Sequence, residues 1–250
     1  MGRPACWFPA PGRCFSVVLA VFLLAIVPQT IAISCDCGNS PLVECVSTCA
    51  PNKTTSLSYV GNGGTIPQAI ATLTKLQVVN LTHLELTGTL PEQLELRKLP
   101  ALTTFVVNNN QLTGDLQILE GLEHALEGDK LLLPPLRLLS LSDNEFEGPI
   151  PAVLGSLSSL TSLMLGNNSK INGSLPASIG SLKQLTTLSM GNTYLEGTIP
   201  PSLGSLERLS KFSLFNNYLT GTVPGGTELN TVESSGGFCQ MLQSVVDQNG

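Results

Sequence analysis

Short strings of the form Gly-x-x-Pro recur along this chain at a nearly constant interval. The strings end at Pro67, Pro91, Pro151, Pro176, Pro200 and Pro224. Four of the five gaps between neighbouring strings are 24, 25, 24 and 24 residues. A fixed period of this length is typical of a solenoid, in which each repeat forms one coil and packs against the coils beside it.

Spaced leucines precede every string after the first, and with the unit at Leu99, which ends in GDLQ, they align as six units of the form LxxLxxLxLxxNxLxGxIP. The units begin at Leu73, Leu99, Leu133, Leu157, Leu182 and Leu206. The LxL part alternates with period two, so Val79 and Leu81 should point inward from a short strand while their neighbours point outward. Hydrophobic residues are 42% of the chain and aromatic residues only 5%, so the shared core must be aliphatic.

Over residues 65–224 this pattern resembles the plant-type leucine-rich repeat of receptor-like protein ectodomains and polygalacturonase-inhibiting proteins. The resemblance implies an α/β solenoid: a right-handed superhelix with a short-strand parallel sheet on its concave face and 3-10 or short helices on its convex face. It also implies binding and no enzymatic activity. Residues 35–45, CDCGNSPLVEC, depart from the N-terminal cap of the inhibitors, which weighs against that particular function.

Asparagine follows the strand by three residues in four units. The four are Asn110, Asn144, Asn168 and Asn217. A buried amide there should satisfy backbone groups where the chain turns inward, and bond to the next coil. Leu84 and Thr193 replace it in the first and fifth units, so we expect a weaker ladder there, with Thr193 a partial substitute. The glycine of each string should permit a tight turn, and the proline should fix φ.

The interval lengthens in the second unit, where residues 117–132 are additional. Leucines at 119, 122 and 126 alternate with glutamates at 120, 123 and 127, which predicts a short amphipathic helix on the convex side. The segment is either a tolerated insertion or an acidic surface for a partner.

The N-terminal residues 1–34 have the features of a secretory signal peptide. Arg3 and Arg13 precede an apolar run over residues 15–27, and cleavage should fall after Ala32 or Ser34. An uncleaved signal anchor, which would tether the chain to a membrane, is the alternative. Cleavage leaves 10 of 12 basic side chains against 18 acidic ones, a net charge near −8. That balance disfavours nucleic acid and anionic membranes as partners, and the mature chain should not insert into a membrane.

Four cysteines cluster directly after the predicted cleavage points. They are Cys35, Cys37, Cys45 and Cys49. In an oxidising compartment two disulfides are expected, with the pairing open; a zinc site is the less favoured alternative. We expect a cysteine-containing cap with a degenerate leading repeat over residues 35–72, six repeats over 73–224 and a C-terminal cap or tail over 225–250. This tail, which contains Cys239, resembles the segment after the last repeat of plant receptor-like proteins.

Catalytic motifs are lacking in the sequence. The two histidines, His83 and His124, lie outside any metal-binding spacing. His83 and Asp143 should lie two coils apart, too far for a base and its orienting carboxylate. We therefore expect neither an enzyme nor a cofactor or metal.

The outward positions of the predicted strands form columns that could bind a ligand. One column reads His83, Asn109, Asp143, Asn167, Asn192 and Asn216. The candidate binding residues are Lys211, Phe215, Asn216, Asn192, Ser189, Met164 and Asp143. Sequons occur at Asn52, Asn80, Asn167 and Asn172. Because glycans at Asn80 and Asn167 would shield the first and fourth coils, contact should favour the coil of Lys211 and Phe215.

The leading hypothesis is a secreted recognition protein of the apoplast or cell wall, with a receptor-like or defence role, that binds a protein, peptide or glycan. The alternatives are an inhibitor of a secreted cell-wall-degrading hydrolase and an ice-binding protein, since ranks of Thr, Ser and Asn can order water.

Overall fold

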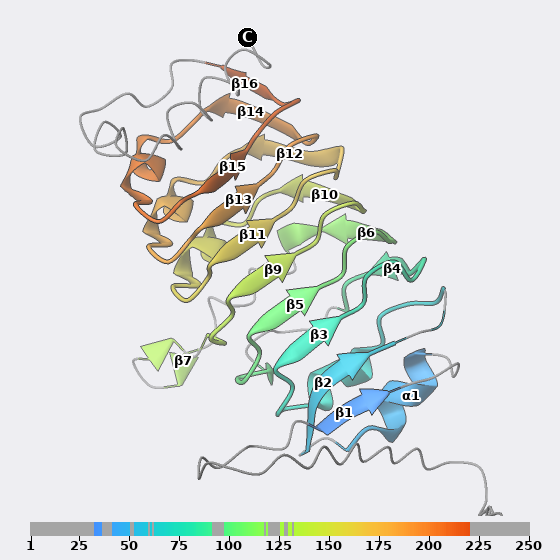
Figure 1. The fold of residues 1–250 in the computed structure, drawn as a ribbon. Helices are drawn as coiled ribbons and strands as arrows, with labels where there is room; N and C mark the ends of the chain where they lie inside the picture. Colours follow the sequence, from blue (N-terminus) through green and yellow to red (C-terminus); the bar gives the residue numbers. More distant parts are fainter. Residues whose placement is uncertain are drawn as a thin grey trace, which may run out of the picture. The chain divides into compact units, whose positions relative to one another are not determined.

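The computed structural model describes a stack of coils within residues 32–250 (Figure 1). The residues it describes are 33–36, 42–50, 53–59, 61, 63–91, 98–117, 119, 126–127, 130–131 and 133–220. The predicted signal peptide up to Ala32, Cys37, Cys239, the Asn52 sequon and the predicted C-terminal cap or tail lie outside the described residues.

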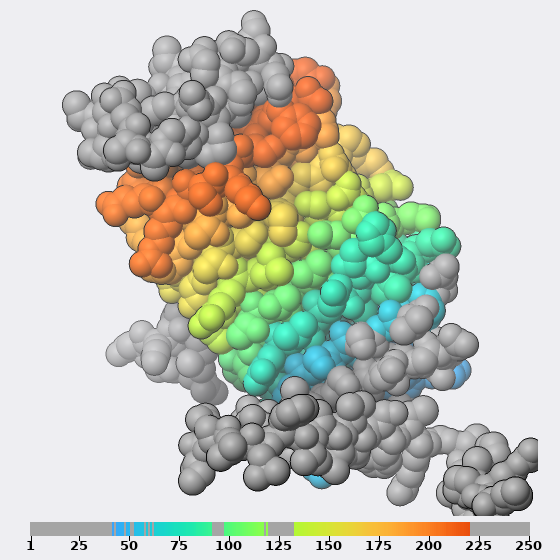
Figure 2. Space-filling model, in the orientation of Figure 1, coloured from blue at the N-terminus to red at the C-terminus, as the bar shows by residue number. Residues whose placement is uncertain are grey.

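A parallel sheet runs through the stack, with one short strand from each coil. Its order is β1 (Ile33–Asp36), β2 (Thr54–Ser58), β3 (Val78–Asn80), β5 (Thr104–Val106), β9 (Leu138–Ser140), β11 (Ser162–Met164), β13 (Thr187–Ser189) and β15 (Lys211–Ser213). The strands stay in register, so Val79, Phe105 and Leu139 are neighbours across the sheet. We call the solvent side of this sheet the strand face; Figure 2 shows the coils crossing it as successive coloured bands.

The predicted LxL alternation is confirmed. The inward residues of β3 to β15 form one buried row. Its members are Val79, Phe105, Leu139, Leu163, Leu188 and Phe212. None is more than 7% exposed, whereas the strand residues on either side are mostly half-buried or exposed. One aliphatic core with two phenylalanines in its main row therefore holds the coils together.

A second parallel sheet, which the sequence analysis did not anticipate, lies beside the first. Its order is β16 (Tyr218–Thr220), β14 (Tyr194–Thr198), β12 (Lys170–Ser174), β10 (Glu145–Pro149), β6 (Gln111–Asp115) and β4 (Thr87–Thr89). Each strand except β4 buries one apolar residue, such as Phe146 or Leu195, between more exposed neighbours. The glycine of each of the first five repeats lies in this sheet with φ between 74° and 100°, so it serves the strand and not only a turn.

Helical segments of 3-10 type are present, as predicted for the convex side; three follow a strand of the second sheet, and the first, η1, precedes β4. They are η1 (Gln68–Thr72), η4 (Ala152–Ser156), η5 (Ala177–Ser181) and η6 (Pro201–Ser205). A proline caps the N-terminus of each, with φ between −76° and −61°. This is the φ that the pyrrolidine ring imposes. Because it is also close to the φ of helical residues, each proline is compatible with the start of the helix that follows.

The buried asparagine ladder, formed by Asn110, Asn144, Asn168 and Asn217, connects the two sheets. In Asn168 the amide nitrogen donates to the backbone oxygens of Leu165 in its own coil (2.8 Å) and Leu141 in the preceding coil (3.1 Å). Its oxygen accepts the N–H of Phe146, also in the preceding coil (3.0 Å). The predicted role is confirmed, but the bonds run to the preceding coil and not to the next one.

Thr193 interrupts this ladder, as predicted. Its hydroxyl lies 3.0 Å from the Met190 oxygen and 2.6 Å from the Asn217 amide oxygen, and its single hydrogen serves both. The Thr193 hydroxyl makes only some of the hydrogen bonds that an asparagine amide makes at this position. The N–H of Ile171 donates instead to the backbone oxygen of Asn168 (3.1 Å). The coil of Asn168 is one residue longer than its neighbours, which gives room for this turn.

The N-terminal segment adds β1 and β2 to the first sheet and a seven-residue helix, α1 (Leu42–Thr48). Cys45 lies within α1 and Cys49 directly after it; both side chains are buried, and each takes part in a disulfide bond. Cleavage after Ala32 would leave β1 whole, whereas cleavage after Ser34 would remove its first two residues.

The helix predicted for residues 117–132 is confirmed only in part: Gln117 and Leu119 have 3-10 helical conformation, whereas residues 126–131 do not form a helix where they are described. Residues Leu126–Glu127 (β7) pair antiparallel with Lys130–Leu131 (β8). A local hairpin replaces the C-terminal part of the expected helix; residues 120–125 are not described.

Candidate functional site

Two outer rows of side chains flank the buried row on the strand face. The first row is Val78, Thr104, Leu138, Ser162, Thr187 and Lys211, and the second is Asn80, Val106, Ser140, Met164, Ser189 and Ser213. In the second row Ser140 is fully buried and donates to the amide oxygen of Asn108 (2.7 Å). Lys211 is the one lysine or arginine in these rows, so the face is polar but nearly uncharged.

The predicted column from His83 to Asn216 has a structural reason for its residue types. All six residues have φ between 52° and 59°, the left-handed region. Among residues with a side chain, Asn, Asp and His enter this region most readily because their short polar side chains bond locally. The backbone therefore selects these residues, whatever ligand the protein binds.

Four members of this column bond to one another in the polar ladder, formed by Asp143, Asn167, Asn192 and Asn216. The amide nitrogen of Asn167 donates to Asp143 (2.6 Å), that of Asn192 to Asn167 (2.5 Å) and that of Asn216 to Asn192 (2.7 Å). Each amide is held by its neighbour, so the ladder presents a fixed line of polar atoms rather than mobile side chains.

Phe215 lies on the strand face beside this ladder and is 38% exposed. A side chain at Gly191, in the preceding coil, would meet the Phe215 ring at 2.6 Å. The ring therefore packs on the bare backbone of Gly191, which fixes its position. The last described coils thus bring together an exposed lysine, a fixed aromatic ring and the end of the polar ladder, with Met164 and Ser189 half-buried in the coils before.

The geometry around His83 and Asp143 gives no catalytic pair. Strand β5 lies between their strands, β3 and β9, as expected. Within the described part of the chain, no three His, Cys, Asp or Glu side chains gather in a way that could hold a metal. Nor does any described helix have the length and apolar character needed to cross a bilayer.

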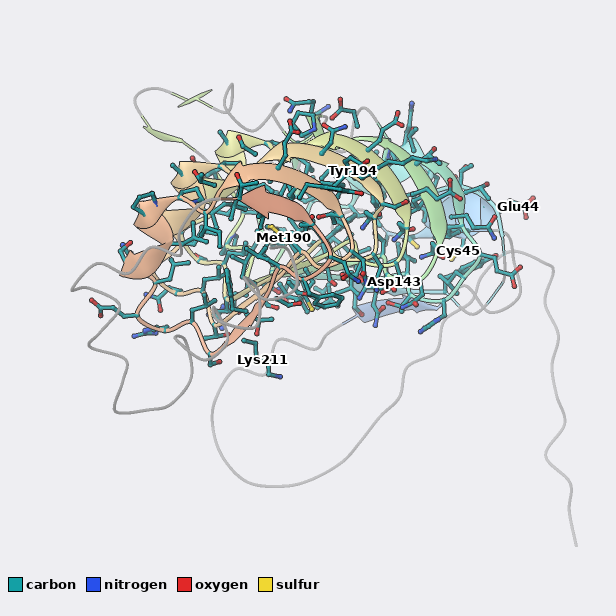
Figure 3. All side chains as sticks on the ribbon, turned by 90° about the horizontal axis from the view of Figure 1, so that it is seen from above. Glu44, Cys45, Asp143, Met190, Tyr194 and Lys211 are labelled. Atoms are coloured by element: carbon teal, nitrogen blue, oxygen red, sulfur yellow. The ribbon has the colours of Figure 1, made fainter. Side chains whose placement is uncertain are left out.

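Two exposed tyrosines on the second sheet were not identified from the sequence. Tyr194 and Tyr218 are 52% and 56% exposed, and their ring centroids are 4.3 Å apart. Figure 3 shows Tyr194 and Lys211 on different sides of the coil, with Met190 in the interior. The sequence contains a signal for this pair, since both tyrosines directly follow the Asn or Thr position of their repeats. The columns predicted for binding, however, contain only residues of the first strand of each repeat and the turn after it.

An open depression of about 430 Å³ adjoins Tyr194. We call it the lateral depression; it is lined by Asp115, Glu147, Gly148, Ser169, Lys170, Asn172 and Tyr194. Lys170 forms an ion pair with Glu145 at 3.0 Å, and both side chains are about half exposed. Exposed pairs of this kind contribute little to stability, about 0–1 kcal/mol.

The tyrosine pair leads to a prediction about pH. The hydrogen bond with Tyr194, with a smaller electrostatic contribution, raises the pKa of Tyr218 above its ordinary value near 10. Deprotonation of Tyr218 removes its hydrogen bond with Tyr194 and places a negative charge beside the Tyr194 side chain. We expect Tyr194→Phe to lower this pKa, measured by NMR titration of ring-labelled tyrosine, with Tyr218→Phe to assign the signal. An unchanged pKa in Tyr194→Phe would contradict the hydrogen bond.

Comparison with known proteins gives the class of this protein. The model of the family Leucine Rich Repeat matches residues 135–157 and 184–206. These matches fall on the coils of β9 and β13. The chain therefore contains leucine-rich repeats at these positions, and its fold is an α/β solenoid.

Similar proteins include plant receptors. Receptor-like protein 9b of Arabidopsis thaliana is 35% identical over 104 residues, which are 41% of this chain and 10% of that protein. The ectodomain of the Arabidopsis thaliana receptor kinase GASSHO1/SCHENGEN3, solved with CASPARIAN STRIP INTEGRITY FACTOR 2, is 31% identical with a TM-score of 0.60; the match covers 75% of this chain and 21% of that one. The structure of PEPR1-AtPEP1 is 32% identical with a TM-score of 0.61, covering 77% of this chain and 25% of the other. This chain therefore spans a quarter or less of each of these relatives.

Proposed function

We propose that this protein is an extracellular, receptor-like recognition protein that binds a peptide or protein on its strand face. The observation that carries the proposal is the last described coil, whose strand-face side holds the exposed Lys211, the Phe215 ring packed on Gly191, and Asn216 of the polar ladder. Aromatic residues are enriched at protein interfaces, and a ring that is already fixed in place loses little conformational entropy on binding. The similar GASSHO1/SCHENGEN3 ectodomain, which was solved with CASPARIAN STRIP INTEGRITY FACTOR 2, supports a partner of this class.

The remaining predicted site residues have a supporting role in this proposal. Asn192 and Asp143 belong to the polar ladder, whose outward atoms offer hydrogen bonds to a peptide backbone without a cost for ordering side chains. Met164 and Ser189 are half-buried on the strand face, and they form the base of the proposed binding surface. The outer rows mix Thr, Ser, Val, Leu and Met, so they lack the identical ranks that ice binding would require.

The test is a pair of double variants of the secreted protein. We expect Lys211→Ala with Phe215→Ala to weaken partner retention about thirtyfold or more, as loss of two interface anchors does. The matched control is Arg208→Ala with Tyr218→Ala, which removes one cation and one aromatic ring from the same coil but not from the strand face. Partners are captured from extracellular extract and their affinities measured by titration.

Equal retention by both double variants would contradict binding through the strand face. Capture of a secreted glycan hydrolase that the wild type inhibits and the Lys211/Phe215 variant does not would assign the inhibitory role instead.

A further inference from the structure

The sequon of Asn172 lies beside the tyrosine pair. Asn172 is exposed on β12 and is the register partner of Tyr194 on β14. Parallel neighbours of this kind are about 4.8 Å apart, so a group attached to the Asn172 amide starts next to the Tyr194 ring. Tyr218, on the next strand, packs against Tyr194 with the rings tilted by 38°.

Asn172 also lines the lateral depression, as does Tyr194. The Asn172 amide donates only one long bond, 3.3 Å to the backbone oxygen of Lys170, so one of its two hydrogens is not held by the described part of the chain. At about 430 Å³ the lateral depression is within the range of small-ligand sites, about 300–1,000 Å³.

The lining suits a sugar. A pyranose ring has faces of C–H groups, which pack on aromatic rings, and a rim of hydroxyl groups, which need hydrogen-bond acceptors. Tyr194 supplies an exposed ring, and the carboxylates of Asp115 and Glu147 supply acceptors. Among the described residues none bonds to the Glu147 carboxylate, and Asp115 accepts only the backbone N–H of Gln117 (2.8 Å).

We propose that the first sugars of an N-linked glycan on Asn172 occupy the lateral depression and pack on Tyr194, with Tyr218 supporting that ring. The glycan is then part of the folded surface rather than a mobile appendage. This inference rests on the extracellular location in the proposed function, because the sequon is modified in the secretory pathway.

The other described sequons lack this setting, which makes one of them a control. Asn80 is exposed on β3, where its register partners are Ser58 and Val106, and its amide oxygen accepts a bond from Thr82 (2.7 Å). Asn167 has its amide in the polar ladder. Neither has an aromatic register partner, so a glycan on Asn80 should be mobile.

The experiment compares glycan release at Asn172 and Asn80 in the folded protein secreted from mammalian cells. Peptide-N-glycosidase converts a glycosylated Asn to Asp, and mass spectrometry of peptides gives the rate at each site. We expect release at Asn172 to be about tenfold slower than at Asn80, since an aromatic contact of typical strength must first open. In Tyr194→Ala with Tyr218→Ala the two rates should become similar, whereas Phe215→Ala on the strand face should change neither.

Thermal unfolding gives a second measurement. Asn172→Gln and the tyrosine double variant should each lower the melting temperature of the glycosylated protein by about 2–4 °C, and the triple variant by no more than either. In protein made in bacteria, which carries no glycan, the tyrosine variant should have no such effect.

The outcomes separate this inference from the proposed function. Modification of Asn80 with none at Asn172, equal release rates, or slow release that persists without the tyrosines would each overturn the docked glycan alone. Absence of glycan from every sequon of the chain produced by its native tissue would overturn the extracellular location as well.

Discussion

Asn168→Ala should lower the free energy of unfolding by about 3 kcal/mol, because it leaves at least two buried backbone groups without partners at about 1–3 kcal/mol each. Asn168 is 0% exposed and serves Phe146, Leu141 and Leu165. For a domain of this size, 3 kcal/mol corresponds to a fall in melting temperature of about 6–12 °C. Circular dichroism on unglycosylated protein measures it.

Asn167→Gly is the matched control for this prediction. Asn167 is the adjacent residue, of the same type, but its bonds to Asp143 and Asn192 are exposed. Glycine accepts its φ of 57° without strain, so we expect a loss of about 0.5 kcal/mol. Equal losses in the two variants would contradict the separation between a buried ladder that stabilises the fold and a surface ladder that does not.

The contrast between these two asparagines shows what the sequence could predict. Asn168 follows its strand by three residues in a repeated pattern, and a buried amide in that place has few other roles than bonding to backbone. Asn167 belongs to an outward column, which was interpreted as a surface for a ligand. In the structure the φ of Asn167 is positive. A polar residue in a repeated column indicates a positive φ only when the geometry of the turn is already known.

The second sheet was missed for a related reason. Leu112, Phe146 and Leu195 each stand between polar residues, which is the alternation of a strand, but the nearby glycine favoured a turn. Glycine with positive φ within a strand is unusual, and here the stacked coils impose it. Because that sheet was not expected, Tyr194 and Tyr218 were not recognised as neighbours.

The segment 117–132 shows the limit of periodicity itself. Leucines at helical spacing predict a helix only if the chain is free to form one, and here both ends are anchored in adjacent coils. Strands β7 and β8 pair with each other within residues 126–131 of the same loop. Local pairing thus takes the place of the expected helix at β7 and β8, whereas Gln117 and Leu119 keep a 3-10 helical conformation.

Gly155→Ala should destabilise the solenoid by about 1–3 kcal/mol, the usual cost of overpacking. Gly155 lies in η4, and a methyl group there would lie 2.6 Å from Cβ of Ser178 in η5 and closer still to its backbone oxygen. Ser178 cannot move aside easily, because its hydroxyl donates to the Ala152 oxygen (2.7 Å) and the caps fix both helices. The two coils must therefore separate.

Ser156→Ala, on the next residue, is the control, since Ser156 is exposed and alanine is favourable in a helix. Urea unfolding gives the stabilities, and amide hydrogen exchange over residues 152–156 and 177–181 shows whether the loss is local. Faster exchange there, with the strands of the first sheet still protected, is expected because each coil contacts chiefly its neighbours. An unchanged urea midpoint in Gly155→Ala would mean that η4 and η5 can move apart without loss of stability. Close contact between these helices would then not contribute to the stacking of the coils.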